Sequence, residues 1–386
     1  MRSLPRKTKQ EVEKLTEKNK LTDIPHKILE EAYKAGIDPE EKQHAGTFFH
    51  VDHSTIYSKV NEVFKGKIEL MDIKNALRKY SWLNRYIWKA VDPNKDEYTR
   101  KVAENYSGGY FMRILPNTEV EFPLQSCLMI TEQNLEQRVH NIILAEEGSK
   151  AHIVTSCLQH STVENGSHIG ISEIYVKKNA MLNFSMIHNW SETTLVRPRS
   201  ASVIEDNASF VSNYICLKPV RNVQMYPVAD CNGENSRVSF NSILYGQGNS
   251  LLDIGSKAVL TGRGSKAEMI SRAIVKTGAK MIVRGRVEGN NTDCKGHLEC
   301  RGLILDDESH LESIPELIAR KKGVEITHEA AVGKISEKEI VYLMTRRLSR
   351  DQATSVIIRG FMDTRIMGLP PHLNSEIERV VEMATA

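Results

Sequence analysis

The chain has 386 residues, 40% of them hydrophobic and 26% charged, with a formal net charge of +3. This is the profile of a globular protein with a substantial core, and the small net charge gives no reason to expect a nucleic-acid partner. No apolar run approaches the roughly 20 residues that a membrane span needs, and the basic N-terminus lacks the apolar stretch of a signal peptide. We therefore expect a cytoplasmic protein that binds neither membranes nor nucleic acid.

Residues 1–104 are predicted to form an N-terminal helical region. The stretch "IPHKILEEAYKAGI" (24–37) carries apolar residues at helical spacing and ends near Gly36, which suits a helix C-cap. The stretch "ELMDIKNALRKYSWLNRYIWKAV" (69–91) shows a further helical pattern. We expect a helix in each stretch, preceded by a strongly charged segment with few apolar residues.

The segment between these two stretches, "KQHAGTFFHVDHSTIY", contains four potential metal ligands, His44, His50, Asp52 and His53. Side chains of adjacent residues, such as Asp52 and His53, seldom point the same way. A polar loop is therefore the preferred interpretation of this segment, and a metal site is the alternative.

From residue 105 to residue 325 the helical periodicity gives way to short β-branched runs. Most of these runs are separated by a Gly or Asn that is followed closely by a small residue. Successive small residues lie 31, 28, 28, 14, 15, 14 and 30 positions apart, which is one or two units of about 14 to 15. The small residues are Ser149, Ala180, Ala208, Ser236, Ser250, Ser265, Ala279 and Ser309.

This internal repeat predicts the fold. Gly and Asn tolerate the left-handed backbone of a tight corner, and a small residue fits beneath that corner. Two corners per coil, one about every 14 residues, are typical of a β-solenoid. We therefore predict a mainly β protein whose core, residues 105–325, is a right-handed parallel β-helix. An antiparallel sandwich with regular turns is the alternative.

The remaining residues, 326–386, are predicted to form a C-terminal helical domain. Ser336 with Glu339, and Ser349 with Gln352, have the spacing of capping boxes at the starts of two consecutive helices. Apolar residues at helical spacing give these helices two facing stripes. The helical hairpin would either cap the solenoid or dock a partner, and the two roles are compatible.

The cysteines show no C-x-x-C pairs, so the chain has neither a zinc-ribbon spacing nor most local iron–sulfur motifs. We expect reduced thiols, most of them buried as small apolar side chains. No P-loop, no H-E-x-x-H pair and no G-x-S-x-G elbow is present. The six cysteines are Cys127, Cys157, Cys216, Cys231, Cys294 and Cys300.

One stretch, "CKGHLEC", joins two of these cysteines. In a strand, Leu298 and Cys300 lie on one face, while His297 and Glu299 lie on the other. Cys294 would share the face of Cys300 if it belonged to the same strand. The stretch cannot chelate a metal alone, so any ligand set that includes Cys300 needs residues from elsewhere. By residue type alone, a packed core thiol is the preferred interpretation of Cys300.

The longer run "GHLECRGLILDDESHLESIPELIARKKGVEITHEAAVGKISEKEIVYLMTRRLSRDQATSVIIRGF" resembles the C-terminal part of the SufB/SufD family of iron–sulfur cluster assembly scaffolds. The shared features are the Cys-containing strand, the "DDES" turn, "SIPELIAR", "HEAAVGKI" and the two helices. A weaker similarity extends back through "YPVADCNGENSRVSF" to about residue 100. The resemblance implies a central β-helix with helical ends, which agrees with the repeat.

The resemblance also implies site residues. The family Cys and Glu that are implicated in cluster building correspond to Cys300 and Glu329, with His328 beside them. SufD-type chains lack that Cys, so this chain is SufB-like. Cys231 matches another family cysteine and is a weaker candidate for the metal site. Cys157 and Cys294 are left open.

The function implied by the resemblance is a scaffold rather than an enzyme. It would build a nascent, transient iron–sulfur cluster for apo-proteins, driven by a SufC-like ABC ATPase that docks on residues 334–365. The second scaffold chain would be another copy in a minimal homodimer or a SufD-like chain. A flavin is compatible with this function, but no motif indicates one.

Two solenoid enzymes are the alternatives. A carbohydrate-active lyase or hydrolase needs carboxylates and basic residues clustered on one solenoid face, and it needs export. The sequence shows no export signal, and its acidic cluster, Asp306, Asp307 and Glu308, falls at a corner. A hexapeptide-repeat acyltransferase needs a six-residue period, which a spacing of 14 to 15 does not give.

Overall fold

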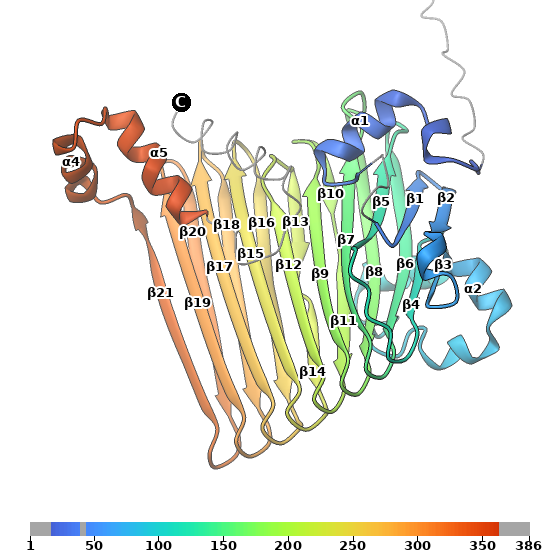
Figure 1. Cartoon of the computed structure of the whole chain (residues 1–386). Coiled ribbons are helices and arrows are strands. Elements are labelled where there is room, and N and C mark those ends of the chain that lie inside the picture. The colour runs from blue at the N-terminus through green and yellow to red at the C-terminus, as the bar shows by residue number, and fades with distance from the viewer. Residues whose placement is uncertain (1–16, 39–43, 363–386) are drawn as a thin grey trace, which may run out of the picture.

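The computed structural model describes residues 17–38 and 44–362. The chain winds into a parallel β-solenoid of about eight turns, with helices at both ends (Figure 1). Each coil contributes a strand to each of two facing sheets, and all pairings are parallel except β1–β2 and β3–β4. The mainly β solenoid predicted from the corner repeat is confirmed.

The first sheet has ten strands. In spatial order they are β2 (Ser54–Val60), β1 (Gly46–Val51), β5 (Leu124–Ile130), β7 (Lys150–Gln159), β9 (Met181–Asn189), β12 (Ser209–Cys216), β15 (Arg237–Gln247), β17 (Lys266–Lys276), β19 (Lys295–Ile304) and β21 (Glu325–Lys334).

The second sheet has eleven strands. They are β3 (Ile68–Asp72), β4 (Tyr110–Ile114), β6 (Leu135–Ala145), β8 (Gly166–Val176), β10 (Leu195–Val196), β11 (Arg199–Ile204), β13 (Asn222–Met225), β14 (Val228–Cys231), β16 (Leu251–Leu260), β18 (Lys280–Gly289) and β20 (His310–Ala319).

The corners of the solenoid follow the predicted chemistry. Two of the eight predicted corners are exceptions to the pattern. At Ser250 the residue of positive φ is Gly248, two positions earlier, and no residue of positive φ directly precedes Ser309. The repeat missed other corners: Asn117, Asn134, Asp293 and Gly323 also have positive φ between consecutive strands. At Asp293, which has φ 60°, Cys294 occupies the small-residue position. At the other six predicted corners a residue of positive φ directly precedes the small side chain: Gly148, Asn179, Asn207, Asn235, Gly264 and Gly278.

The N-terminal region contains more strand than expected. The predicted polar loop is wrong, because most of it forms β1 and β2, and β1 pairs in parallel with β5. Phe48 packs into the solenoid interior, whereas Phe49 and Val51 pack outside it against helix α1 (His26–Lys34). A strand that is buried on both faces shows this alternation. The solenoid therefore includes strands from within residues 1–104.

Helices nevertheless occur in both predicted stretches. α1 (His26–Lys34) ends before Gly36, which has φ 98°. The second stretch begins as strand β3 and continues as α2 (Ile73–Lys79) and the 3₁₀ helix η3 (Ser81–Arg85). The shorter helices are η1 (Leu21–Asp23), η2 (Glu62–Phe64) and α3 (Glu97–Glu104).

At the C-terminal end the last strand, β21, runs to Lys334, so strand extends into the region predicted to be helical. α4 (Glu337–Thr345) and α5 (Arg350–Phe361) follow it. The capping box at Ser349 is present, whereas Ser336 makes no side-chain cap, so that capping prediction is wrong. The remainder of the predicted helical domain, 363–386, lies outside the described residues.

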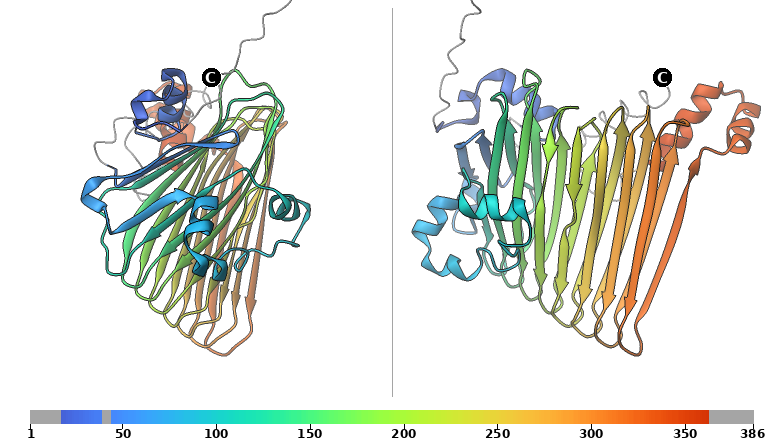
Figure 2. Two further views of the ribbon diagram at one scale, coloured as in Figure 1. Left: turned by 90° about the vertical axis from the view of Figure 1, so that its right-hand side faces the viewer. Right: turned by 180° about the vertical axis from the view of Figure 1, so that it is seen from behind.

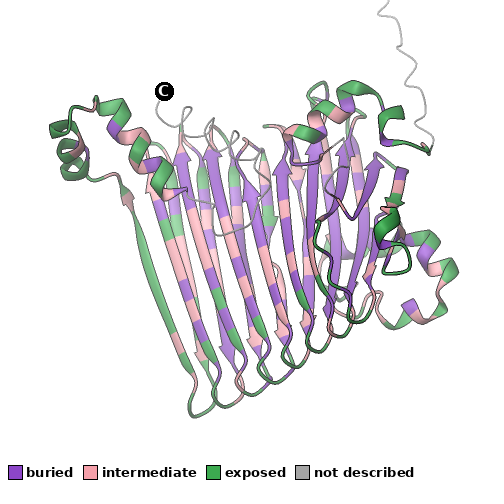
Figure 3. Cartoon of the chain, in the orientation of Figure 1, coloured by how far each residue is buried: buried purple, intermediate pink, exposed green. Residues whose placement is uncertain are grey.

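Burial decreases along the solenoid toward its C-terminal end (Figure 3). β20 pairs only with β18, and β21 pairs only with β19, so both sheets end in a strand with one open edge. Exposed strand edges present unpaired backbone groups that favour pairing with another chain. This end of the solenoid is where the candidate site lies.

Candidate functional site

A small pocket of about 20 Å³ lies where the last coils of the solenoid meet. It brings together the three best candidates predicted from the sequence, Cys300 of β19 with His328 and Glu329 of β21. Glu299 of β19 and Ser313 of β20 also line it. Residues that are about one coil apart in sequence are therefore neighbours in space.

The strand register explains why they meet. β19 and β21 pair so that His328 lies beside Leu298 and Glu329 lies beside Glu299. Since side chains alternate between the two faces of a strand, His328 is on the inward face with Leu298 and Cys300, whereas Glu329 is on the outward face. The predicted faces of β19 are confirmed, because Leu298 and Cys300 both pack against the solenoid core.

The thiol of Cys300 is partly buried. Burial raises its pKa, a hydrogen bond with Ser313 acts in the opposite direction, and the charge of Glu299 adds to the rise. Burial and the neighbouring carboxylate thus favour the protonated form of this thiol. Because metals bind the thiolate, any metal bound by this sulfur would have to displace the proton.

The two carboxylates of the pocket differ in their surroundings. Arg301 Nε lies 2.7 Å from Glu299 Oε1, in an ion pair that lacks hydrogen-bond geometry. Glu329 is exposed, and within the described part of the chain its carboxylate has no ion-pair partner. Glu329 is thus available to a ligand, while Glu299 would first have to leave Arg301.

The pocket is not a complete metal site. Nowhere in residues 17–38 and 44–362 do three His, Cys, Asp or Glu side chains converge as they would around a metal ion. Cys300 and His328 lie on the inward face and Glu329 on the outward face, so the three side chains line the pocket without converging on one point.

The other cysteines lie outside this pocket. Cys231 is fully buried in β14, and burial raises its pKa to about 12. Cys294 is fully buried at its corner, with its Sγ 3.4 Å from Ser265 Oγ. Burial also raises the pKa of Cys157 and of Cys216 to about 12. In the single chain, these buried thiols serve as small apolar side chains of the core.

Comparisons with known proteins now bear on this pocket. A family model described as the SufBD core domain of the SUF system for FeS cluster assembly matches residues 128–361, which is more than half of the chain. The chain belongs to the SufBD family. The matched range contains the whole pocket, both open edge strands and helices α4 and α5.

Several SufBD relatives are similar over nearly the full length. An iron–sulfur cluster assembly SufBD family protein of Methanothermobacter thermautotrophicus (strain Winter) is 46% identical over 99% of this chain and 93% of its own length. One from Archaeoglobus fulgidus is 46% identical over 91% of this chain and 93% of its own. The SufB protein of Bacillus subtilis is 27% identical over 93% of this chain and 78% of its own.

Sequence reasoning missed two residues of the SufBD pocket. Glu299 was assigned to the outward face of its strand but not to the site, although it lies beside Glu329 in register. Ser313 comes from the opposite sheet, and no local pattern links it to Cys300.

Within the described residues, the helices are all too short or too polar to cross a lipid bilayer.

Proposed function

We propose that this SufBD protein is a SufB-like scaffold subunit of a SUF-type machine. It builds a nascent iron–sulfur cluster and passes it to apo-proteins, and it is not itself the enzyme that supplies the driving force. The observation that carries this proposal is the meeting of Cys300, His328 and Glu329 in one pocket at an open end of the solenoid.

The ligand types suit a cluster that must later leave. A thiolate binds iron and sulfide clusters firmly, whereas carboxylate and imidazole ligands exchange more readily. The elevated pKa of the Cys300 thiol adds to this lability, because a proton competes with iron for the sulfur. Cys231, buried in the core, stays a weaker candidate for sulfur handling.

A second scaffold chain would complete the site. The unpaired edges of β20 and β21 border the pocket, and two apolar side chains there are unusually exposed, Leu317 at 37% and Val332 at 40%. Pairing of these edges with another copy, or with a SufD-like chain, would cover the apolar residues and add ligands from across the boundary. The functional unit is then a homodimer or a heterodimer that works in the cytoplasm.

The driving force would come from a SufC-like ABC ATPase docked on residues 334–365, of which 363–365 lie outside the described part. Helix α4 projects beyond β21, whereas α5 turns back over the first sheet (Figure 1). The two helices together expose an apolar surface. Its members are Val341 at 54%, Tyr342 at 58%, Met344 at 42% and Val356 at 49% exposed. Exposed apolar residues gathered on one element are typical of protein interfaces.

Anaerobic reconstitution with iron and sulfide tests the proposal. Cys300→Ser and Glu329→Ala should lose most of the bound iron and acid-labile sulfide, while the matched variant Cys216→Ser, a buried thiol outside the pocket, should retain both. If Cys300→Ser and the parent chain bind equal amounts of cluster, the pocket is not the assembly site.

A further inference from the structure

The N-terminal end of the solenoid carries an unusual concentration of positive charge. Residues 73–91, which we call the basic cap, comprise α2, η3 and the turn that follows. The cap contains no Asp or Glu, and all five of its cationic side chains are exposed. They are Lys74, Arg78, Lys79, Arg85 and Lys89.

Packing holds the cap in place. Ile73, Ala76 and Leu83 are fully buried against Phe111 and Ile142 of the second sheet. The apolar side of the cap is therefore used for folding, and its cations are left on the side that faces solvent.

Hydrogen bonds fix the end of the cap. The backbone N–H groups of Trp88, Lys89 and Ala90 donate to the buried carboxylate of Glu173, over 2.5, 2.7 and 2.7 Å. Charges on a fixed backbone lose less entropy on binding a partner than charges on a mobile loop.

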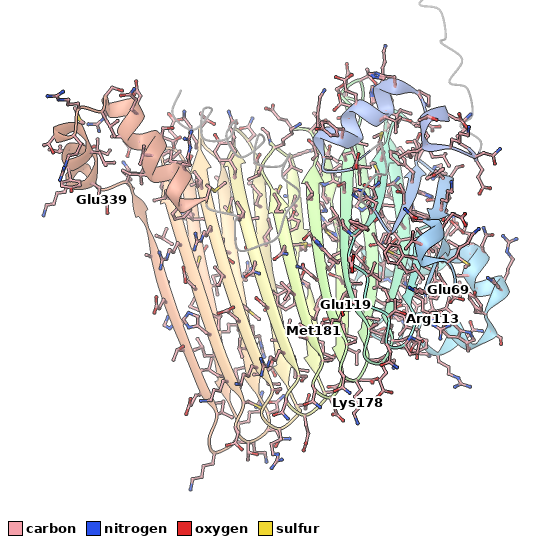
Figure 4. All side chains as sticks on the ribbon, viewed as in Figure 1. Glu69, Arg113, Glu119, Lys178, Met181 and Glu339 are labelled. Carbon is pink, nitrogen blue, oxygen red and sulfur yellow. The ribbon has the colours of Figure 1, made fainter. Side chains whose placement is uncertain are left out.

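The cations of the cap have no carboxylate partner within the described residues. Two acids flank the cap directly: Asp72 accepts hydrogen bonds from Thr55 and from the backbone of Lys74, and the exposed Asp92 accepts one from the backbone of Asn94. Glu69, whose charge acts on Lys79, is paired with Arg113. Figure 4 labels Glu69 and Arg113 close to this end of the solenoid. Lys74 and Lys79 lie over the rings of Tyr106 and Tyr80, and Arg78 donates to Asn75. Within the described residues none of the five cations is in an ion pair, so each can still pair with a carboxylate of another molecule.

The aromatic rings of the cap are occupied. Trp82 packs edge-on against Tyr86 and Phe111, with Arg113 4.7 Å above its ring. Tyr86 packs against Tyr175, and Lys177 lies 5.1 Å from its ring. Single-stranded nucleic acids bind by stacking bases on free aromatic rings, so this arrangement disfavours them.

An anionic membrane is also disfavoured. Amphipathic surfaces that bind membranes insert large apolar side chains beside their cations. Of the large apolar side chains that are exposed in the described residues, none belongs to the cap. A surface whose cations are in no ion pair, whose aromatic rings pack against other side chains and which has no apolar anchor is complementary to carboxylates.

We propose that the basic cap is a docking surface for an acidic protein partner. The cap lies at the end of the solenoid opposite to β21 and the pocket, as two views show (Figures 1 and 2). An acidic protein bound there would approach a different end of the molecule from the second scaffold chain and the ATPase. This surface stands independently of the function proposed above.

The test measures binding of a fluorescein-labelled deca-glutamate peptide to the full chain by fluorescence anisotropy. Low ionic strength is used, about 0.01 M, where charges act over about 30 Å. The triple variant Arg78→Glu/Arg85→Glu/Lys89→Glu removes cations that have no ion pair. The control, Arg237→Glu/Lys266→Glu/Lys280→Glu, changes the net charge equally at exposed solenoid cations that also have no ion pair in the described residues.

We expect the Kd of the peptide to rise at least about tenfold in the cap variant and to change less than about twofold in the control. No binding by the parent chain, or equal weakening in both variants, would overturn the proposal. Tighter cap-dependent binding of labelled oligodeoxythymidylate or of phosphatidylglycerol vesicles would also overturn it, in favour of a nucleic acid or a membrane. Far-UV circular dichroism checks folding, and the corresponding Gln triple variants replace any Glu variant that fails to fold.

Discussion

Replacement of Cys294 by serine tests whether Cys294 and Cys300, the two cysteines of "CKGHLEC", have different roles. Cys294 is fully buried at a corner, where the preceding coils place Ser236 and Ser265. Ser265 Oγ lies 3.4 Å from the Cys294 sulfur and donates a hydrogen bond of 2.7 Å to the carbonyl of Gly262. That carbonyl is 3.5 Å from the sulfur, so a serine hydroxyl at 294 has polar atoms near it.

The expected magnitudes follow from these surroundings. A buried hydroxyl that finds a partner changes stability little, so Cys294→Ser should alter the free energy of unfolding by less than about 1 kcal/mol. Cys294→Leu adds two heavy atoms to a corner with no exposed surface, and overpacking of this kind costs about 1–3 kcal/mol.

Urea unfolding of both variants measures these values, and anaerobic reconstitution measures their cluster content. Cys294→Ser should assemble as much cluster as the parent chain. A loss of more than about 3 kcal/mol in the serine variant would refute the corner interpretation. A loss of cluster in a folded serine variant would instead make Cys294 a ligand.

Three further predictions concern the ends and the interior of the molecule. Tyr342→Ala should weaken binding of the proposed ATPase at least about tenfold in pull-down titrations, whereas Val63→Ala, which truncates an exposed apolar residue elsewhere, should not; equal binding by both variants would remove the docking assignment. Val332→Asp should abolish self-association in sedimentation velocity, whereas Leu251→Asp at an exposed position away from the open edges should not, and a dimer that survives Val332→Asp would place the interface elsewhere. Burial lowers the pKa of His168 to about 3, so the folded protein should lose stability as the pH falls below about 6.5, by about 2 kcal/mol between pH 6.5 and 5. This dependence of the free energy of unfolding on pH should weaken in His168→Gln, and an unchanged dependence would assign the acid sensitivity to other groups.

The solenoid could be predicted from the sequence because its corners are encoded locally. A left-handed Asn or Gly beside a small residue, such as Asn207 before Ala208, records a corner without knowledge of the rest of the chain. The same search missed the corner at Asp293 because it admitted only Ala and Ser beneath a corner, and Cys294 is the small residue there.

The N-terminal strands were harder to predict because both faces of β1 are buried. Phe48 and Phe49 pack into different cores, so the segment shows no alternation of apolar and polar residues. Its histidines suggested a loop, whereas His50 lies fully buried within β1 and its ring Nδ1 hydrogen-bonds to Thr55. Its pairings with β2 and β5 distinguish this strand from a polar connection.

The site was predictable as far as the coil length allowed. Positions about 30 residues apart fall on neighbouring strands, so Cys300 and the pair at 328 and 329 could be expected to approach one another. The contribution of Ser313 depends on which part of the second sheet faces β19, and no local pattern in the sequence specifies that.

In the proposed function, Cys300 and its neighbours form part of a cluster site that a second chain completes. Native mass spectrometry of the chain after anaerobic reconstitution tests it most directly, because iron and sulfide are weighed on each oligomer separately. We expect cluster mass on the two-chain species, none on the single chain, and none on either species of Cys300→Ser. Cluster mass on a single chain, or on Cys300→Ser at the level of the parent, would contradict it.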